Sequence, residues 1–442
     1  MSDPSGRSWP AALRVIGRFH RDARLFLVTT FVAGAALSLY WIDFNLYLAS
    51  LGIPTATIGV VATVASVAGA VAAFPASAAS DRFGRRAVMA AGIAIGLVAL
   101  VGLLLTEGVL LIILFVACWQ VGQMSVQVVA SPFMTEHSDA EHRNELFATQ
   151  YAIQNVTNVL AAVLGGIAAT TIVTLAGGDP AGPATYRVIL VIMAGLLTVS
   201  LATVALLTDD RPRVVTPARL SRVGEPAAFP PDPRRSRARF GVVVGDRGRF
   251  VRLVFPGFLI AIGAGQVIPF LNLFVQQKFG LDLTSLNAVF AITSLGTVAA
   301  ILAQPRLARR YGQITSVVIV QAASIPFLIV LGFSPILWTV ILAMAVRNAL
   351  MNAGNPIFTA FAMEQVTPTE RASLSATMSL LWQIGWVIGA IWFAALQATL
   401  GFEAGFTVDF VTIITLYTIA TALYWVWFRS SDRGVIKARL AT

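Results

Sequence analysis

Long, uninterrupted apolar runs constrain this chain more than any other feature of its sequence. The runs are about 20 residues long, which is the length that an α-helix needs to cross the core of a bilayer, and they lack the alternation of membrane-barrel strands. Only 12% of the 442 residues are charged, whereas soluble domains carry about 25%. These observations exclude a single soluble globular domain and predict an all-α polytopic membrane protein.

The apolar runs divide into twelve candidate spans when they are cut at clusters of charged residues, Pro and Gly. The spans cover residues 25–48, 56–79, 87–105, 109–134, 146–174, 187–208, 252–276, 284–304, 314–333, 336–362, 373–399 and 406–428. A segment rich in Arg and Pro, which cannot cross a membrane, separates the sixth span from the seventh. We therefore expect a basic N-terminal segment (1–24), a six-helix bundle (25–208), a linker (209–250), a second six-helix bundle (251–428) and a tail (429–442).

The basic residues indicate how the spans are oriented. If the N-terminus lies in the cytoplasm, 28 of the 31 Lys and Arg residues fall on the cytoplasmic side. Arg187 and Lys278 then lie outside, and Arg347 lies within a span. This asymmetry predicts a multi-pass protein of the inner or plasma membrane with both termini in the cytoplasm. The net charge of +10 is thereby interpreted as an orientation signal, and no nucleic-acid partner is expected.

The two halves of the chain carry related sequences. Residues 44–48 (FNLYL), near the end of the first span, match residues 271–275 (LNLFV), near the end of the seventh. An offset of 228 residues relates 81–84 to 309–312, and it also relates Glu136 to Glu364 and Arg143 to Arg371. Such a repeat predicts two pseudo-symmetric six-helix bundles with a cavity between them near the bilayer midplane.

The loop after the second span, residues 77–86 (SAASDRFGRR), resembles the signature loop of the major facilitator superfamily, Gly-x-Leu-Ala-Asp-Arg-x-Gly-Arg-Arg. Ser77 and Ala79 replace the usual Gly and Leu, and residues 305–312 form a degenerate second copy. Together with the twelve spans and the linker, the resemblance covers nearly the whole chain. It implies the fold of that superfamily and a secondary transporter that works by alternating access.

The resemblance also implies a cytoplasmic gate. Asp81 would meet the start of the eleventh span near residues 369–373, where a helix dipole stabilises a carboxylate by roughly 0.3–1 kcal/mol. An Arg of the first loop would pair with Glu136, and an Arg of the second copy with Glu364. The alternative is that these basic residues only obey the positive-inside rule. The candidate gate residues are Asp81, Arg82, Arg85, Arg86, Glu136, Arg143, Arg309, Arg310, Glu364 and Arg371.

Ionisable side chains within spans are candidates for function because each costs at least about 2.5–3.5 kcal/mol at the centre of a membrane helix. Asp43 shares a stripe of the first span with Tyr40 and Tyr47 and could bind a proton or a cation. Arg347 lies in the tenth span, which the resemblance places at the cavity, and could bind an anion or act in gating. Alternatively, Asp43 is a satisfied polar residue near the outer interface and Arg347 is a buried pairing partner.

Amides and tryptophans at helical spacing extend the candidate cavity site. Tryptophans flanked by amides suit an amphipathic organic solute better than an inorganic ion, although many amides in membrane helices only hydrogen-bond neighbouring helices. These residues are Gln120, Gln123, Gln127, Gln154, Gln266, Asn272, Asn348, Asn352, Trp382 and Trp386.

The leading hypothesis is a secondary transporter of a small amphipathic or anionic organic solute, with proton coupling through Asp43 as a further hypothesis. The expected partners are the solute, protons and the lipid bilayer, and the chain is expected to be a monomer without cofactor or metal. One alternative is a polytopic enzyme acting on lipid, for which the acidic and histidine-containing loop at 136–142 is the candidate site. Another is a receptor on the same fold that does not transport.

Overall fold

A computed structural model describes residues 19–137, 143–180, 182–208, 246–293, 311–367 and 370–430, and these residues form helices and short connections without a strand. The helices are α2 (Arg21–Ser50), α3 (Thr55–Phe83), α4 (Arg85–Leu105), α5 (Val109–Glu136), α6 (Arg143–Leu175), α7 (Pro183–Ala205), α8 (Arg247–Val267), η2 (Ile268–Phe270), α9 (Leu271–Phe279), α11 (Gln313–Phe333), α12 (Leu337–Glu364) and α13 (Arg371–Phe428). A shorter apolar helix covers Leu283–Thr293. The prediction of an all-α polytopic fold is confirmed.

Ten of the described helical segments are long and apolar enough to cross a membrane. One of them, α13, contains Gly401 with a φ of 74° and bends there, so that it holds both the eleventh and the twelfth predicted span. The eighth predicted span begins within Leu283–Thr293 and continues into residues 294–304, which lie outside the described residues. Eleven predicted spans therefore coincide with described helices, the eighth does so only in its first part, and the full count of twelve stays a prediction.

Glycines with positive φ repeat between the two halves of the chain. Gly52 and Gly280 have φ values of 76° and 63°, and Gly84 and Gly312 have values of 92° and 88°. Each pair is separated by 228 residues, which is the offset that the sequence repeat predicts. Because only glycine adopts this conformation at little cost, both halves use the same residue type to end one helix and begin the next.

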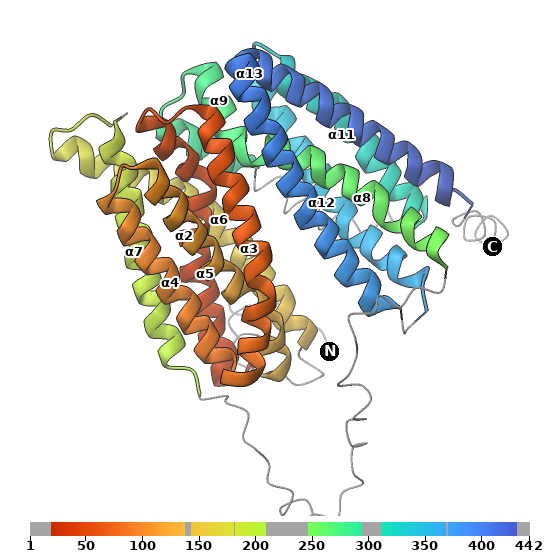
Figure 1. The fold of residues 1–442 in the computed structure, drawn as a ribbon, viewed down its shortest axis with the longest axis horizontal. Helices are drawn as coiled ribbons and strands as arrows, with labels where there is room; N and C mark the ends of the chain where they lie inside the picture. Colours follow the sequence, from red (N-terminus) through yellow and green to blue (C-terminus); the bar gives the residue numbers. More distant parts are fainter. Residues whose placement is uncertain are drawn as a thin grey trace, which may run out of the picture.

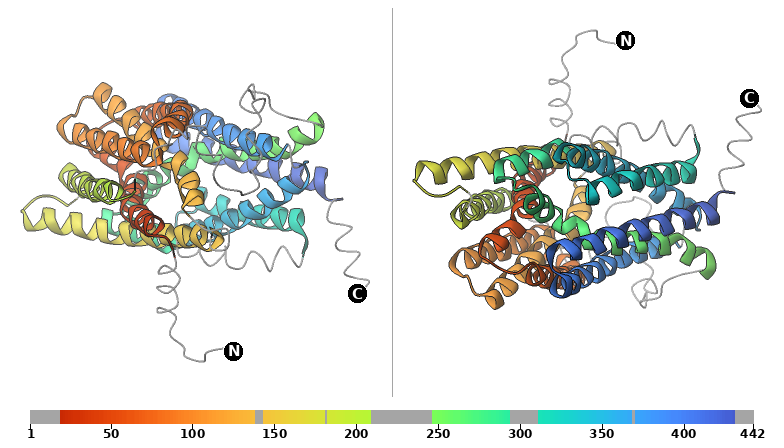
Figure 2. Two further views of the ribbon diagram at one scale, coloured as in Figure 1. Left: turned by 90° about the horizontal axis from the view of Figure 1, so that it is seen from below. Right: turned by 90° about the horizontal axis from the view of Figure 1, so that it is seen from above.

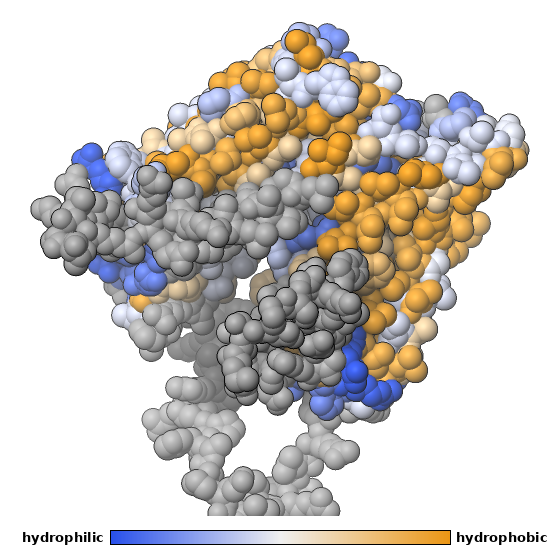
Figure 3. Space-filling model, turned by 180° about the vertical axis from the view of Figure 1, so that it is seen from behind, coloured by the Kyte–Doolittle hydropathy of each residue, from blue (hydrophilic) through white to orange (hydrophobic). Residues whose placement is uncertain are grey.

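The helices form two bundles that lie side by side (Figures 1 and 2). In the first bundle α4 packs on α5 and α2 on α7, and in the second α13 packs on α8 and α11 on α12. Their outer surfaces expose large apolar side chains such as Leu110 and Val98, and Figure 3 shows the resulting hydrophobic patches on one face of the molecule. A surface of this kind suits lipid, because an aqueous surface rarely carries such large apolar patches.

The bundles touch each other mainly at one end. The linker end is defined here by Thr208, after α7, and Asp246, before α8; the opposite end is called the closed end. Figure 1 shows the bundles meeting at the closed end and diverging toward the linker end. At the closed end Asn45 donates a hydrogen bond to the Pro269 carbonyl, and Asn272 donates one to the Ile42 carbonyl, each at 2.5 Å.

These two bonds are related by the sequence repeat. Asn45 and Asn272 occupy the same place in the matching segments 44–48 and 271–275, and each bonds the carbonyl three residues before the other. The bonds are therefore reciprocal. A sequence repeat found from residue types alone becomes a pseudo-symmetric contact between the bundles.

Within each bundle, glycines allow close helix packing. A Cβ atom on Gly122 of α5 would lie 2.4 Å from the Gly92 carbonyl oxygen of α4, whereas a Cβ on Gly195 of α7 would meet no atom within 4 Å. Small residues at such crossings let membrane helices approach closely.

We expect Gly122→Ala to destabilise the protein by about 1–3 kcal/mol, because the added methyl group overpacks a backbone contact. Gly195→Ala is the matched control and is expected to be neutral or slightly stabilising, since Ala is the better helix former. Thermal unfolding of the purified proteins in detergent measures both effects. Equal melting temperatures for the two variants would contradict the close α4–α5 contact.

Candidate functional site

A cavity of about 700 Å³ lies between the two bundles, in the half of the molecule nearer the linker end. It is lined by α3 and α5 from one bundle and by α8, α11, α12 and α13 from the other. Leu253 lies six residues from the start of α8, and Phe74 nine residues from the end of α3, which corresponds to depths of roughly 9–14 Å along the helices. Closed-end contacts lie beyond it, so the cavity is blocked on that side.

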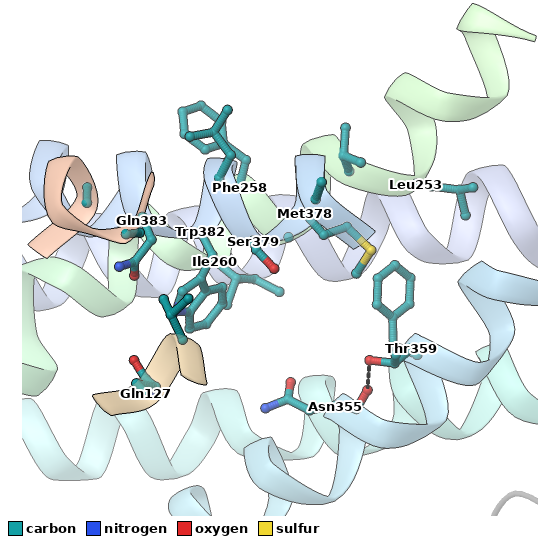
Figure 4. A pocket seen from close by; sticks show the side chains of 18 of the residues that line it. Gln127, Leu253, Phe258, Ile260, Asn355, Thr359, Met378, Ser379, Trp382 and Gln383 are labelled. Atoms are coloured by element: carbon teal, nitrogen blue, oxygen red, sulfur yellow. Dashed lines mark hydrogen bonds between the residues drawn. The ribbon is translucent and has the colours of Figure 1, made fainter. Parts of the chain in front are cut away.

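The cavity wall combines apolar surface with uncharged polar groups. Figure 4 shows the amides of Gln127 and Asn355 across the cavity from Trp382 and Ser379. The Thr359 hydroxyl donates to the Asn355 backbone carbonyl at 2.9 Å. This bond orients the Thr359 side chain and leaves the side-chain amide of Asn355 free of it. None of the described lining residues is an Asp, Glu, Lys, Arg or His. The described part of the wall offers hydrogen bonds and aromatic surface but no charged side chain.

Two of the predicted site residues, Gln127 and Trp382, line this cavity. Three others, Tyr40, Gln120 and Trp386, line a second cavity of about 60 Å³ nearer the closed end. The Trp386 ring lies 6.0 Å from that of Trp41, edge to face, across the bundle interface.

The remaining predicted amides and Tyr47 lie outside the lining of the large cavity. Tyr47 is buried and donates to the Leu103 carbonyl at 3.3 Å, within its own bundle. Gln266 is buried as well, and Asn352 donates to the Asn348 carbonyl of the preceding helical turn. Two further amides, Gln123 and Gln154, are partly buried. The amide stripes thus divide between the cavity, the bundle interface and contacts within a bundle.

Arg347 points into the second bundle and does not line the cavity. Its side chain donates to the Tyr417 hydroxyl at 3.0 Å and to Asn348 Oδ1 at 3.1 Å, and its guanidinium carbon lies 5.7 Å from the centre of the Tyr417 ring. The residue is 5% exposed. This placement corresponds to the buried pairing partner, which was the alternative to an anion-binding role.

Asp43 lies at the interface between the bundles near the closed end. It is 2% exposed, and its Oδ1 accepts a hydrogen bond from Asn287 of the second bundle at 3.2 Å. Asn272, another predicted site residue, lies in the same region through its bond to the Ile42 carbonyl. These groups connect the bundles and do not face the large cavity.

The candidate gate residues that the structure describes pair within their own bundles. Arg85 of α4 forms an ion pair with Glu136 of α5 at 3.0 Å, and Arg86 donates to the Ala205 carbonyl at 2.6 Å. Glu364 accepts from Gln313 at 3.1 Å.

Other gate residues take no described part in a contact between the bundles. The Arg82 guanidinium lies over the Phe83 ring at 5.2 Å. Outside the described part of the chain lie Arg309, Arg310 and the side chains of Asp81, Arg143 and Arg371. The gate therefore stays a prediction from the resemblance.

Three buried polar residues were not among the candidate site residues predicted from the sequence. Asn287 contacts Asp43, and Gln321 lines the large cavity. Asp409 is a fully buried carboxylate within the twelfth span, and it has no ion-pair partner among the described residues. A systematic list of all ionisable and amide residues within spans includes all three.

Comparison with known proteins agrees with the architecture. A family model, the Major Facilitator Superfamily, matches residues 26–390 and 253–438. No curated protein sequence matches the chain.

Solved structures similar to this chain include the nucleoside transporter NupG (D323A mutant; TM-score 0.71, 15% identity, covering 92% of this chain and 99% of that one). A second is a bacterial homologue of the human lysosomal transporter Spinster, in an inward-facing and occupied conformation (TM-score 0.70, 15% identity, 92% and 96%). A third is a D-xylose–proton symporter (TM-score 0.66, 14% identity, 95% and 98%). At these identities the likeness shows a shared fold.

Arg347→Met is expected to lower stability without weakening binding at the cavity. The substitution leaves the Tyr417 hydroxyl and Asn348 Oδ1 without their donor, which costs about 1–3 kcal/mol, while the cavity wall is unchanged. Melting temperature and the affinity for a solute that raises it measure the two effects separately. An unaltered melting temperature together with binding weakened tenfold or more would instead place Arg347 at the solute.

Proposed function

This chain belongs to the Major Facilitator Superfamily and is a secondary transporter rather than an enzyme, and we propose that it moves a small, neutral, amphipathic organic solute by alternating access. The observation that carries the proposal is the wall of the large cavity, which presents amides, hydroxyls and aromatic rings and, among its described residues, no charged side chain. The cavity volume of about 700 Å³ falls in the usual range for small-molecule sites.

The character of the wall favours a neutral solute over an anionic one. An ion that leaves water for a membrane-buried cavity needs a partner charge to offset its desolvation. Arg347, the basic residue predicted to bind an anion, instead donates hydrogen bonds to Tyr417 and Asn348 inside its own bundle. Gln127, Asn355 and Ser379 can instead donate and accept hydrogen bonds with hydroxyl, carbonyl or ring-nitrogen groups.

The distribution of basic residues supports an orientation with the linker end in the cytoplasm. The conformation then opens toward the cytoplasm and is closed on the outer side by the reciprocal bonds of Asn45 and Asn272. Opening of the outer side requires these bonds to break and the bundles to rock about the site, while new contacts form at the linker end. Ion pairs within each bundle, such as Arg85–Glu136, are compatible with rigid-body movement of this kind.

Asp43 supports coupling to protons. It is a buried carboxylate at the interface between the moving bundles, and the described residues offer it no ion-pair partner. An intramembrane carboxylate of this kind is a functional candidate by default.

A receptor on the same fold that does not transport is the second candidate, because the fold does not imply activity. Movement of a bound solute across proteoliposome membranes distinguishes the two. Binding without any such movement would favour the receptor.

A thermal-shift screen is expected to select neutral amphipathic solutes over organic anions of similar size, because a ligand of the folded state raises its melting temperature. Gln127→Ala should weaken the selected solute roughly two- to tenfold, which is the effect of losing one uncharged hydrogen bond. Gln123→Ala is the matched control, since it removes an amide from the same helix but outside the cavity lining. Selection of anions, or equal losses in the two variants, would contradict the proposed site.

In proteoliposomes, uptake of the selected solute is expected to respond to an imposed pH gradient, and Asp43→Asn should abolish that response while leaving solute binding intact. The amide keeps the shape of the carboxylic acid but cannot exchange a proton. An unchanged gradient dependence in Asp43→Asn would remove Asp43 from the mechanism.

A further inference from the structure

Asp43 and Asn287 meet across the interface between the two bundles. Asp43 lies in α2 of the first bundle and Asn287 in the helix Leu283–Thr293 of the second. They are 2% and 0% exposed, and one hydrogen bond joins them, from Asn287 Nδ2 to Asp43 Oδ1 at 3.2 Å.

One oxygen of each side chain has no hydrogen-bond partner among the described residues. These atoms are Asp43 Oδ2 and Asn287 Oδ1, both fully buried. When Asp43 is ionised, both atoms are acceptors and cannot bond each other. A proton on Asp43 Oδ2 turns that oxygen into a donor, and the acid and the amide then form a cyclic pair in which each group donates once and accepts once.

The described residues around the pair are mostly apolar and offer no second group that would stabilise the charge. Ile42 of α2, Ala162 of α6 and Ala291 of the helix Leu283–Thr293 form a small apolar cluster. A Cβ on Gly166, also in α6, would lie only 2.7 Å from Asn287 Nδ2. The interface next to the pair is therefore close-packed. An ionised carboxylate that is this buried and has no counter-charge among the described residues is costly in a membrane protein.

Titratable and basic groups near the closed end are engaged elsewhere. The Tyr186 hydroxyl of α7, within electrostatic range of Asp43, accepts a hydrogen bond from Gln276 of α9 at 3.1 Å. Lys278 donates to the Gly332 carbonyl at 2.9 Å, and Arg187 pairs with Glu107. None of them has a described bond to Asp43, so Asn287 is the polar partner that responds to its protonation.

We propose that Asn287 is the positioning residue that converts protonation of Asp43 into closure of the outer side. With a proton on Asp43 Oδ2, two hydrogen bonds join the bundles at this point. Without that proton, one hydrogen bond remains and the two buried acceptor oxygens, Asp43 Oδ2 and Asn287 Oδ1, are left unsatisfied. Protonation of Asp43 therefore favours the closed end, and loss of the proton favours its opening. The inference rests on the proposed alternating access and adds the residue through which the proton acts.

Asp409 and Gln397 provide an internal comparison. Asp409 is buried beside the buried amide of Gln397, so the two residues offer the same combination of acid and amide. Both residues belong to α13 and lie on either side of its bend at Gly401. A proton on Asp409 changes contacts within one bundle and is expected to leave the interface between the bundles unaffected.

The test measures the separation of the bundles at the closed end and needs no substrate. Spin labels are attached to Gly108→Cys and Gln277→Cys, which are exposed at that end of each bundle, in a Cys118→Ser background that removes the single native cysteine. Double electron–electron resonance on protein in lipid nanodiscs at about pH 5 and about pH 9 brackets the range in which buried carboxylates titrate. We expect one short distance at low pH and an additional longer distance at high pH.

The variants assign the response. Asp43→Asn should keep the short distance at both pH values, because its amide can donate to Asn287 Oδ1. Asn287→Ala, with Asn287→Ser as a second variant should the first fail to fold, should show the longer distance at both values and shift the ratio of the two by up to roughly tenfold. Asp409→Asn should respond as the wild type does.

Three outcomes overturn the proposal: a wild-type distance distribution that does not change with pH, a wild-type response retained in the Asn287 variants, or a response lost in Asp409→Asn. Transport of the selected solute is measured separately in proteoliposomes. If the wild type shows the distance response but does not transport the solute, the proposed function is contradicted and the role of Asn287 stands. If the wild type transports the solute but shows no distance response, the role of Asn287 is contradicted and the proposed function stands.

Discussion

The arrangement of the two bundles depends on their contacts at the closed end, where α3 packs on α13 and Asn45 and Asn272 form reciprocal hydrogen bonds. Each amide donates to a backbone carbonyl of the other bundle, and a carbonyl within a helix can accept because it has two lone pairs. The Pro269 carbonyl belongs to the short 3-10 segment η2, where the regular α-helix is interrupted between α8 and α9. Because neither bond carries a charge, each can break during alternating access at a cost that other contacts can offset.

The fold could be predicted from the sequence because its determinants are local. The lengths of the apolar runs, the Arg-rich linker and the loop at 77–86 need no knowledge of side-chain direction. The repeat was also visible, since residues 44–48 and 271–275 match by type. The structure adds that these two matching segments touch each other.

Site residues were harder to predict for a physical reason. A helix of a polytopic membrane protein is apolar toward lipid and apolar toward its neighbours, so the stripe that identifies the inner face of a soluble helix is weak. Gln127 lines the cavity, whereas Arg347 turns toward Tyr417 and Asn348. Sequence spacing determines which residues share a face of a helix. The packing of neighbouring helices determines whether that face lines the cavity, contacts another helix or faces lipid.

The separation of the cavity from Asp43 limits how coupling can work under the proposed function. The described cavity wall holds no charged residue, and Asp43 lies at the closed end, bonded to the opposite bundle. Proton and solute therefore do not need to touch; each biases the same movement of the bundles. Coupling between two sites is typically about 1–3 kcal/mol, and one additional uncharged hydrogen bond contributes about 0.5–1.5 kcal/mol. A single bond gained on protonation is thus of the right size, and by linkage the bound solute must change the proton affinity of Asp43 by the same factor.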